Sequence, residues 1–386
     1  MRNPRMLMIV LSVVASSYAV EPPNGGPAAQ SVNGAAPSTV NTMPEFTPAL
    51  RSIETIRKTL LDKPGDPQLY ADLSMALSRR ARETDDPSWC VRALEAADQA
   101  LAVQKDHFPA LKARVWALLG QHEFSQAREL AQALNKRAPD DLQLYGFLVD
   151  SNIELGNYKE AERAAQWMLD MRPGIIPGLT HAASLREIYG DFEGSQQLLL
   201  QALQETPPQE AEDRAWLLTH IAHLDRKSGK LAAAERTLNE AFKVFPGYHY
   251  ALGEMGELKL EQRKPEEAAV LFERRFQSAP HPENLYALAG ALRAGGKTEQ
   301  AQDAYTRFEH MALAVSSGWD NANRELIAYY AGEGKRPDEA LRLAKLETGR
   351  RKDIPTLLAY EKALAANGQT AEVKAVEQQV TLAIAK

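Results

Sequence analysis

The stretch that decides the fold is Leu155-Gly156-Asn157-Tyr158-Lys159-Glu160-Ala161: a glycine turn, a polar residue, an aromatic residue, two polar residues and Ala. Aligned on its last residue, the pattern recurs at positions 127, 161, 195, 234, 268, 301, 340 and 373. Apart from two longer intervals, the period is about 34 residues, which is the length of a known helical repeat. A fixed period of this kind indicates a repeat array in a chain of 386 residues, rather than two or three globular domains.

Prolines share this period. In five successive units a proline follows the reference residue by twelve positions, namely Pro139, Pro173, Pro207, Pro246 and Pro280. Proline cannot continue a helix, so each unit is expected to end there. The small reference residue is expected where the two helices of a unit approach most closely. Because neither helix buries its apolar face alone, such units stack into a solenoid.

The residues around Ala161 that carry a family resemblance are Tyr145, Leu148, Tyr158, Ala165 and Pro173. With them the chain resembles the tetratricopeptide repeat (TPR) superfamily. The resemblance implies an all-α, right-handed superhelical solenoid of about nine helix-turn-helix repeats. We expect a capping helix over residues 50–61, a capping helix over 370–385, and an enlarged turn over 82–88.

The two longer intervals, from position 195 to 234 and from 301 to 340, predict inserts over 206–214 and within 314–321. Inserts in a solenoid project from one side and often serve binding, although longer loops without a role are also common.

The first segment has the order of a secretory signal peptide. Residues 1–19 contain Arg2 and Arg5, then an apolar run over residues 6–14, then small residues up to Ala19. The run is too short to cross a bilayer, so we expect cleavage after Ala19, no transmembrane segment afterwards, and a periplasmic or secreted protein. Residues 20–48, rich in Pro, Gly and Ala, are expected to form a flexible linker, and residues 49–386 the TPR solenoid.

Composition argues against several functions. The single cysteine, Cys90, rules out an internal disulfide framework and is interpreted as a small buried residue, with an intermolecular disulfide as the alternative. The net charge of −6 is unfavourable for nucleic acid. No catalytic, phosphate-loop or metal motif is present, so we expect neither an enzyme nor a cofactor.

In the TPR family the first helices of the repeats line a concave groove, and certain repeat positions face the ligand. Carried over to this chain, those positions predict a partner-binding groove with aromatic and mixed-charge residues. They are Lys112, Trp116, Asp150, His181, Trp216, His220, His223, Arg226, Tyr250, Glu254, Glu257, Tyr286, Arg293, Glu325 and Tyr329, with Gln143, Glu154, Ser184, Glu187 and Thr219 at further positions of the same kind. Exposed aromatic residues would anchor a peptide or stack on a sugar, whereas each alone could equally pack against its neighbouring helix. The resemblance implies no carboxylate clamp, because Lys112 is isolated and the Asn residues of such clamps are missing.

Five of these residues form a ladder along successive units: His181, His220, His223, Glu254 and Glu257. Such a ladder could bind Zn²⁺ or act as a pH-sensitive patch, but histidines on polar helix faces are common, and we expect no metal.

The sequence therefore predicts a non-catalytic scaffold or adaptor of the cell envelope that binds a protein segment in its concave groove. A carbohydrate-binding module of a polysaccharide export or envelope assembly system is the alternative. A hydrolase that uses Glu254, Glu257 and the histidines is a third hypothesis.

Overall fold

The described part of the protein consists of helices, and all but the first of them pair into hairpins. The computed structural model describes residues 47–318 and 320–385, in which there are 19 helices and no strand. None of the described helices is both long and apolar enough to span a bilayer. The expected signal peptide and nearly all of the expected linker lie outside the described residues. The first helix, α1 (Pro48–Asp62), begins at the last residue of the expected linker and is capped by Thr47.

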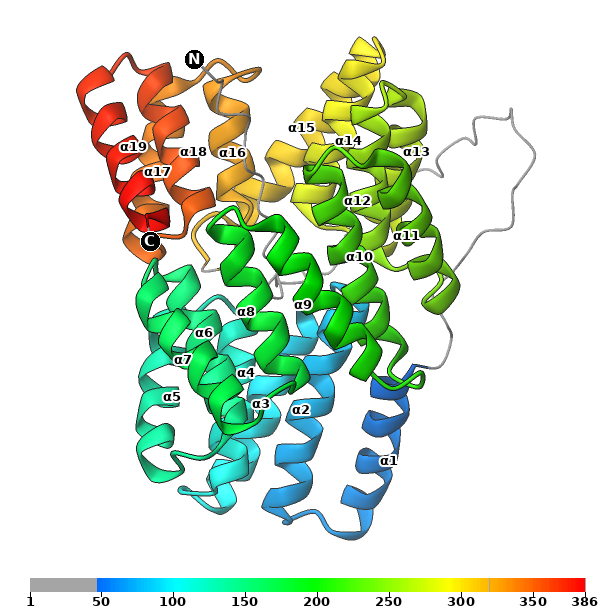
Figure 1. Ribbon diagram of the computed structural model, residues 1–386, viewed down its shortest axis with the longest axis vertical. Helices are drawn as coiled ribbons and strands as arrows, with labels where there is room; N and C mark the ends of the chain where they lie inside the picture. The colour runs from blue at the N-terminus through cyan, green and yellow to red at the C-terminus, as the bar shows by residue number, and fades with distance from the viewer. Residues whose placement is uncertain (1–46, 319, 386) are drawn as a thin grey trace.

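Nine hairpins follow α1 in the described part of the chain, in agreement with the predicted number of repeats (Figure 1). The first helices of the hairpins are α2 (Pro67–Thr84), α4 (Phe108–Gly120), α6 (Leu142–Glu154), α8 (Ile176–Ile188), α10 (Ala211–Lys227), α12 (His249–Glu261), α14 (Pro282–Ala294), α16 (Asn323–Ala331) and α18 (Ile354–Ala366). The second helices are α3 (Ser88–Val103), α5 (Phe124–Arg137), α7 (Tyr158–Met171), α9 (Phe192–Glu205), α11 (Leu231–Val244), α13 (Pro265–Ser278), α15 (Thr298–Val315), α17 (Pro337–Arg350) and α19 (Thr370–Ile384).

The small residue that defines the period lies where the helices meet. Ala127, Ala161, Ser195, Ala234 and Ala268 are all 0% exposed, and the equivalent Ala301 and Ala340 are also fully buried. The last equivalent, Val373 in the terminal helix α19, is only half-buried. Seven of the eight positions are thus fully buried, as expected for small residues between packed helices.

Each turn inside a hairpin contains one residue in the left-handed region. Five turns use glycine, for example Gly156 with φ 74° and Gly229 with φ 76°. Four use other residues, namely Asp85, His122, Arg263 and Lys335, with φ between 49° and 60°. The repeat geometry therefore fixes this backbone conformation even where the sequence does not supply glycine.

Two first helices are longer than the others. Most first helices have 13 residues, whereas α2 has 18 and α10 has 17. The predicted enlarged turn over 82–88 is wrong, because α2 continues to Thr84 and the turn proper is short. The predicted insert over 206–214 mostly extends α10 by a turn of helix, because residues 211–214 are helical. The predicted insert within 314–321 follows a second helix that is also long, α15, which has 18 residues and ends at Val315.

These extensions of α2 and α10 meet across the superhelix. Arg79 of α2 lies 2.5 Å from Glu210 and 3.3 Å from Asp213, which lies on α10. Arg82 of α2 lies 3.0 Å from Glu212, whose carboxylate also accepts a hydrogen bond from the hydroxyl of Tyr248 at 2.7 Å. The extra turns therefore join the first repeat to the fifth.

Repeats six apart also touch, so that successive turns of the superhelix are in contact. His281 at the start of repeat 7 binds the backbone carbonyl of Asp85 in repeat 1. His122 of repeat 2 lies 3.6 Å from Asp320, before repeat 8. In repeat 9 the amide of Ile354 donates to the hydroxyl of Tyr158 in repeat 3, at 2.9 Å. The result is a compact coil rather than an open crescent, with α16 to α19 above α5 to α7 (Figure 1).

Candidate functional site

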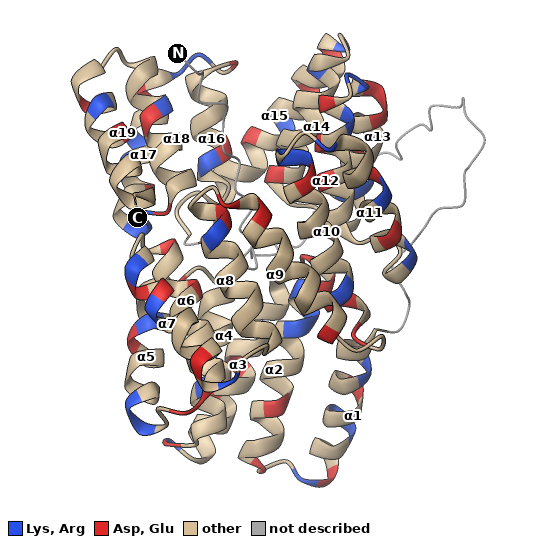
Figure 2. Ribbon diagram, in the orientation of Figure 1, with Lys and Arg blue, Asp and Glu red and all other residues tan. Residues whose placement is uncertain are grey.

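The predicted groove residues all lie on first helices, where the repeat register places them. They are distributed over α4 (Lys112, Trp116), α6 (Asp150), α8 (His181), α10 (Trp216, His220, His223, Arg226), α12 (Tyr250, Glu254, Glu257), α14 (Tyr286, Arg293) and α16 (Glu325, Tyr329). We call the surface formed by these first-helix faces the inner wall. Basic and acidic residues alternate along the array and do not gather at opposite ends (Figure 2).

In the early repeats, charges on the inner wall are paired within the protein. The ammonium group of Lys112 donates to Asp141, which caps α6, at 2.6 Å. His181 on α8 lies 3.4 Å from Asp150 on α6. Lys112 and Asp150 are therefore engaged in contacts between neighbouring repeats.

In the middle repeats a chain of ion pairs crosses three first helices. The His223 ring lies between two carboxylates, with Nε2 at 3.1 Å from Glu187 of α8 and Nδ1 at 3.1 Å from Glu254 of α12. Arg226 also binds Glu254, and its Nη1 donates to Glu261 at 2.5 Å. We call Glu187, His223, Glu254, Arg226 and Glu261 the ionic chain.

The electrostatics of the ionic chain match its geometry. Burial opposes charge on His223, but the carboxylates of Glu254 and Glu187 raise its pKa to about 9. Burial likewise opposes ionisation of Glu254, but His223 and Arg226 lower its pKa to about 2. The imidazolium and the carboxylate are thus both charged at neutral pH and hold repeats 4, 5 and 6 together.

The predicted His and Glu ladder is accordingly a structural network. His220 packs against Trp216, with ring centroids 4.0 Å apart, and burial lowers the pKa of His220. Burial raises the pKa of Glu257 and of Glu325. Across residues 47–318 and 320–385, no three His, Cys, Asp or Glu side chains are grouped as a metal ion would require.

Most of the predicted aromatic anchors pack against neighbouring side chains. Trp116 and Trp216 are half-buried against apolar clusters, and the Tyr250 ring lies 3.9 Å from His249. Tyr329 is 6% exposed and stacks on Tyr305 at 5.1 Å. The contacts of these four residues agree better with packing against neighbouring side chains than with the role of exposed binding anchors.

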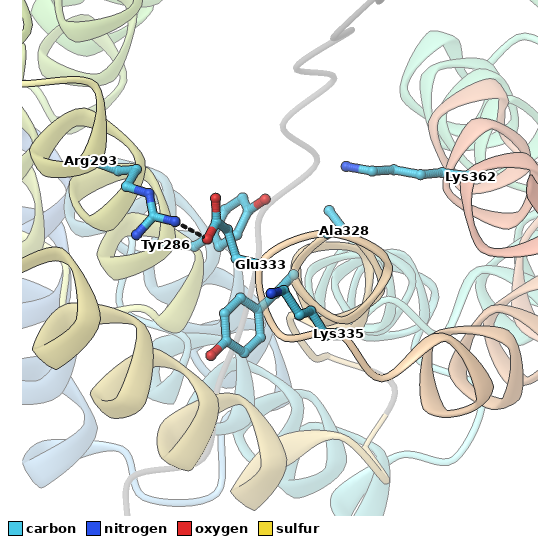
Figure 3. A pocket seen from close by; sticks show the side chains of 8 residues that line it. Tyr286, Arg293, Ala328, Glu333, Lys335 and Lys362 are labelled. Atoms are coloured by element: carbon cyan, nitrogen blue, oxygen red, sulfur yellow. Dashed lines mark hydrogen bonds and ion pairs between the residues drawn. The ribbon is translucent and has the colours of Figure 1, made fainter. Parts of the chain in front are cut away.

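Repeats 7 to 9 differ, because their first helices border an open surface pocket of about 370 Å³, in which the side chains of Arg293, Glu333, Lys335 and Lys362 are exposed (Figure 3). Its lining comes from α14, α16, the turn after α16, and α18. The lining residues are Tyr286, Arg293, Ala328, Tyr329, Gly332, Glu333, Lys335 and Lys362. Arg293 is paired with Glu333 across the pocket edge, and Lys362 points toward them from α18 (Figure 3).

Comparisons with known proteins bear on the fold. No protein-family model matches the sequence, and no curated protein is similar to it at a significant level. Among solved structures, the APC/C hetero-tetramer Cut9-Hcn1 matches with a TM-score of 0.52 and 14% identity, over 76% of this chain and 55% of that chain. The human IFIT1 dimer with m7Gppp-AAAA matches with a TM-score of 0.54 and 10% identity, over 88% of this chain and 87% of that one. A tetratricopeptide repeat protein from Parabacteroides merdae has a TM-score of 0.48 and 18% identity, over 63% and 92% of the two chains.

Two of these superpositions extend over three quarters of this chain or more, and they cover its regularly repeating helix hairpins. The chain has the fold of a TPR solenoid. It spans about half the length of the chain that it matches in the Cut9-Hcn1 hetero-tetramer.

The TPR register also explains which pocket residues sequence reasoning missed. Lys362 follows Tyr329 by one repeat length and takes the equivalent position of the last repeat, but the register was not extended that far in selecting groove residues. Glu333 and Lys335 lie in the turn between α16 and α17, outside the TPR positions that usually face a ligand. No sequence signal identified those two residues as part of a site.

Proposed function

We propose that this TPR solenoid is a non-catalytic protein-interaction scaffold of the cell envelope, which holds a segment of a partner protein against the inner wall at repeats 7 to 9. The observation that carries the proposal is the pocket, whose lining residues come from three successive repeats. A segment that lies across several repeats would touch all of these helices, as expected for a solenoid that binds through its concave face. Of the similar structures, one is the Cut9-Hcn1 hetero-tetramer.

The ionic chain supports a role without catalysis. A general base must be able to release and accept a proton near the working pH. His223, with a pKa of about 9, stays charged at neutral pH, and so does Glu254, with a pKa of about 2. His223 and Glu254 are therefore unsuited to the acid and base roles that the hydrolase hypothesis would give them.

A protein partner fits the inner wall better than the alternatives do. Trp216 and Tyr250, two of the rings expected to stack on sugars, are occupied by His220 and His249. IFIT1 is found with m7Gppp-AAAA, but the net charge of −6 and the many inner-wall carboxylates of this chain are unfavourable for phosphate groups.

The proposal is tested by capture from an envelope extract of the native organism. Wild-type protein should retain a stoichiometric protein partner, and added glycan should not displace it. Ala328→Trp, which fills the pocket, should lose the partner, whereas Ala371→Trp on the exposed face of α19 should keep it. Retention on polysaccharide alone, or equal capture by both variants, would contradict the proposal.

The envelope location is tested separately. Cell fractionation should place the protein in the periplasm or the medium, and sequencing of its amino terminus should begin at Val20. An intact amino terminus in the cytoplasmic fraction would refute export.

A further inference from the structure

The pocket contains more hydrogen-bond donors than acceptors. Three cationic side chains, Arg293, Lys335 and Lys362, face one carboxylate, Glu333, which is already paired with Arg293. Neither Lys335 nor Lys362 has an ion-pair partner in the described parts of the chain. Both ammonium groups are therefore available to a ligand.

The tyrosine at the base of the pocket adds a further donor. Tyr286 packs against Phe308 of α15, with ring centroids 5.1 Å apart, and burial raises its pKa, so that the phenol stays protonated. Its hydroxyl has no hydrogen-bond partner within the described residues. Burial also lowers the pKa of Lys362, because no carboxylate compensates the partial loss of water around its ammonium group.

This arrangement contrasts with the ionic chain on the same inner wall. There each cation is matched, since His223 and Arg226 contact three carboxylates between them. At the pocket two cations remain unmatched, and an incoming anionic group would meet them without displacing an internal carboxylate. Two carboxylates, Glu325 and Glu333, also raise the pKa of Tyr286, but each contributes less than burial and Tyr305 do.

The volume limits the size of what enters. A pocket of about 370 Å³ holds one or two side chains and no folded domain. An extended segment whose backbone lies along the inner wall could bring acidic side chains to Lys335 and to Lys362, which line the pocket from different elements (Figure 3).

We infer that the pocket binds side-chain carboxylates of an acidic peptide segment, with Lys335 and Lys362 as the charge partners and the Tyr286 hydroxyl as a neutral donor. The inference rests on the proposed scaffold function and names the chemistry of the partner. It requires no free carboxyl terminus, since the acidic side chains supply the charge.

The test uses calorimetry on residues 20–386 with a hexa-glutamate peptide that is acetylated and amidated, so that it has no terminal charge. We expect saturable one-to-one binding that weakens with added salt, and no binding of the neutral hexa-glutamine peptide. Lys335→Gln and Lys362→Gln should each weaken binding by about tenfold, as expected for the loss of one hydrogen bond to a charged group. Lys374→Gln on the exposed face of α19 is the matched control and should bind like wild type.

Three results would overturn the inference: no saturable binding by wild type, equal affinity in the double lysine variant, or tighter lysine-dependent binding of an oligoglucuronate than of the peptide. Thermal melting of each variant checks that the fold is retained. The outcome is independent of the capture experiment. If a variant that lacks both lysines still captures a partner, the scaffold function stands and this inference fails. If hexa-glutamate binds but no partner is captured, the inference stands and the scaffold function fails.

Discussion

At the scale of single residues, the turns inside the hairpins are under unequal strain. Arg263 adopts φ 60° and is exposed, whereas Gly229 adopts φ 76° with open space around it. The left-handed region costs a residue with a side chain about 1 kcal/mol more than glycine. Arg263→Gly should therefore raise the free energy of unfolding slightly, by up to about 1 kcal/mol, and Gly229→Ala should lower it by about 1 kcal/mol. Urea unfolding measures both, and a loss of stability in Arg263→Gly would show that its side chain contributes more than the strain costs.

The ionic chain should make stability depend on pH through His223. Its pKa rises from 6.5 in the unfolded chain to about 9 in the folded protein. The stabilisation is therefore complete below pH 6.5 and is lost as the pH rises through about 9. His223→Gln should destabilise the protein by on the order of 2–3 kcal/mol at pH 6, and by much less at pH 10.

Melting temperatures of wild type and His223→Gln at pH 6 and pH 10 measure this difference. His310→Gln on α15 is a suitable control, because His310 is in no ion pair with a described residue, and it should show no such trend. A constant gap between wild type and His223→Gln at both pH values would contradict the protonated ion pair.

Sequence reasoning placed His223 and Glu254 on first helices, as the structure does, but did not predict that they pair with each other. The repeat register determines which face a residue occupies. The register does not give the distance between neighbouring first helices. That distance decides whether charged side chains on two helices pair with each other or stay available to a ligand. Here the helices are close enough for His223 to reach Glu187 and Glu254 at 3.1 Å.

At the scale of helices, the ion pairs between α2 and the start of α10 differ in burial. Arg82 reaches the buried Glu212, whereas the side chains of Arg79 and Glu210 are 40% and 37% exposed. Arg82→Met should cost about 3 kcal/mol, because a buried carboxylate loses its partner, and Arg79→Met less than about 1 kcal/mol. Denaturant unfolding measures both.

Adding Glu212→Gln to Arg82→Met checks the mechanism, since it removes the unpaired charge and should restore part of the lost stability. If the double variant is as unstable as Arg82→Met alone, or less stable, the cost does not arise from the buried carboxylate.

The helical repeat itself was predictable, because period, proline positions and small residues all repeat with it. The enlarged turn over 82–88 was not predicted correctly. Its polar residues suggest a loop when considered locally, but Arg82 and Asp85 gain partners more than a hundred positions away, which compensates for the extension of α2. Such contacts leave no periodic signal in the sequence.

At the scale of the whole molecule, the contact between repeats 3 and 9 can be tested with one substitution. A Cβ atom at Gly156 would meet the Lys352 carbonyl oxygen at 2.6 Å, whereas at Gly190 it would meet nothing within 4 Å. The two glycines have similar φ, 74° and 79°. Gly190→Ala should cost about 1 kcal/mol of backbone strain, and Gly156→Ala about 2 kcal/mol more.

Small-angle scattering shows whether the extra cost opens the coil. Gly156→Ala should have a larger radius of gyration than wild type, and Gly190→Ala should not. Equal stability and equal size for the two variants would mean that the turns of the superhelix do not hold each other in solution.

The contacts between repeats six apart also have a mechanical consequence. A solenoid that is held together only by contacts between adjacent repeats extends easily under tension, because each interface between two repeats opens slightly. In this chain the contacts at Asp85, His122 and Tyr158 tie one coil to the next. A pulling force along the axis would act on these contacts first. The molecule should therefore resist extension at low force and extend easily only after the coils have separated.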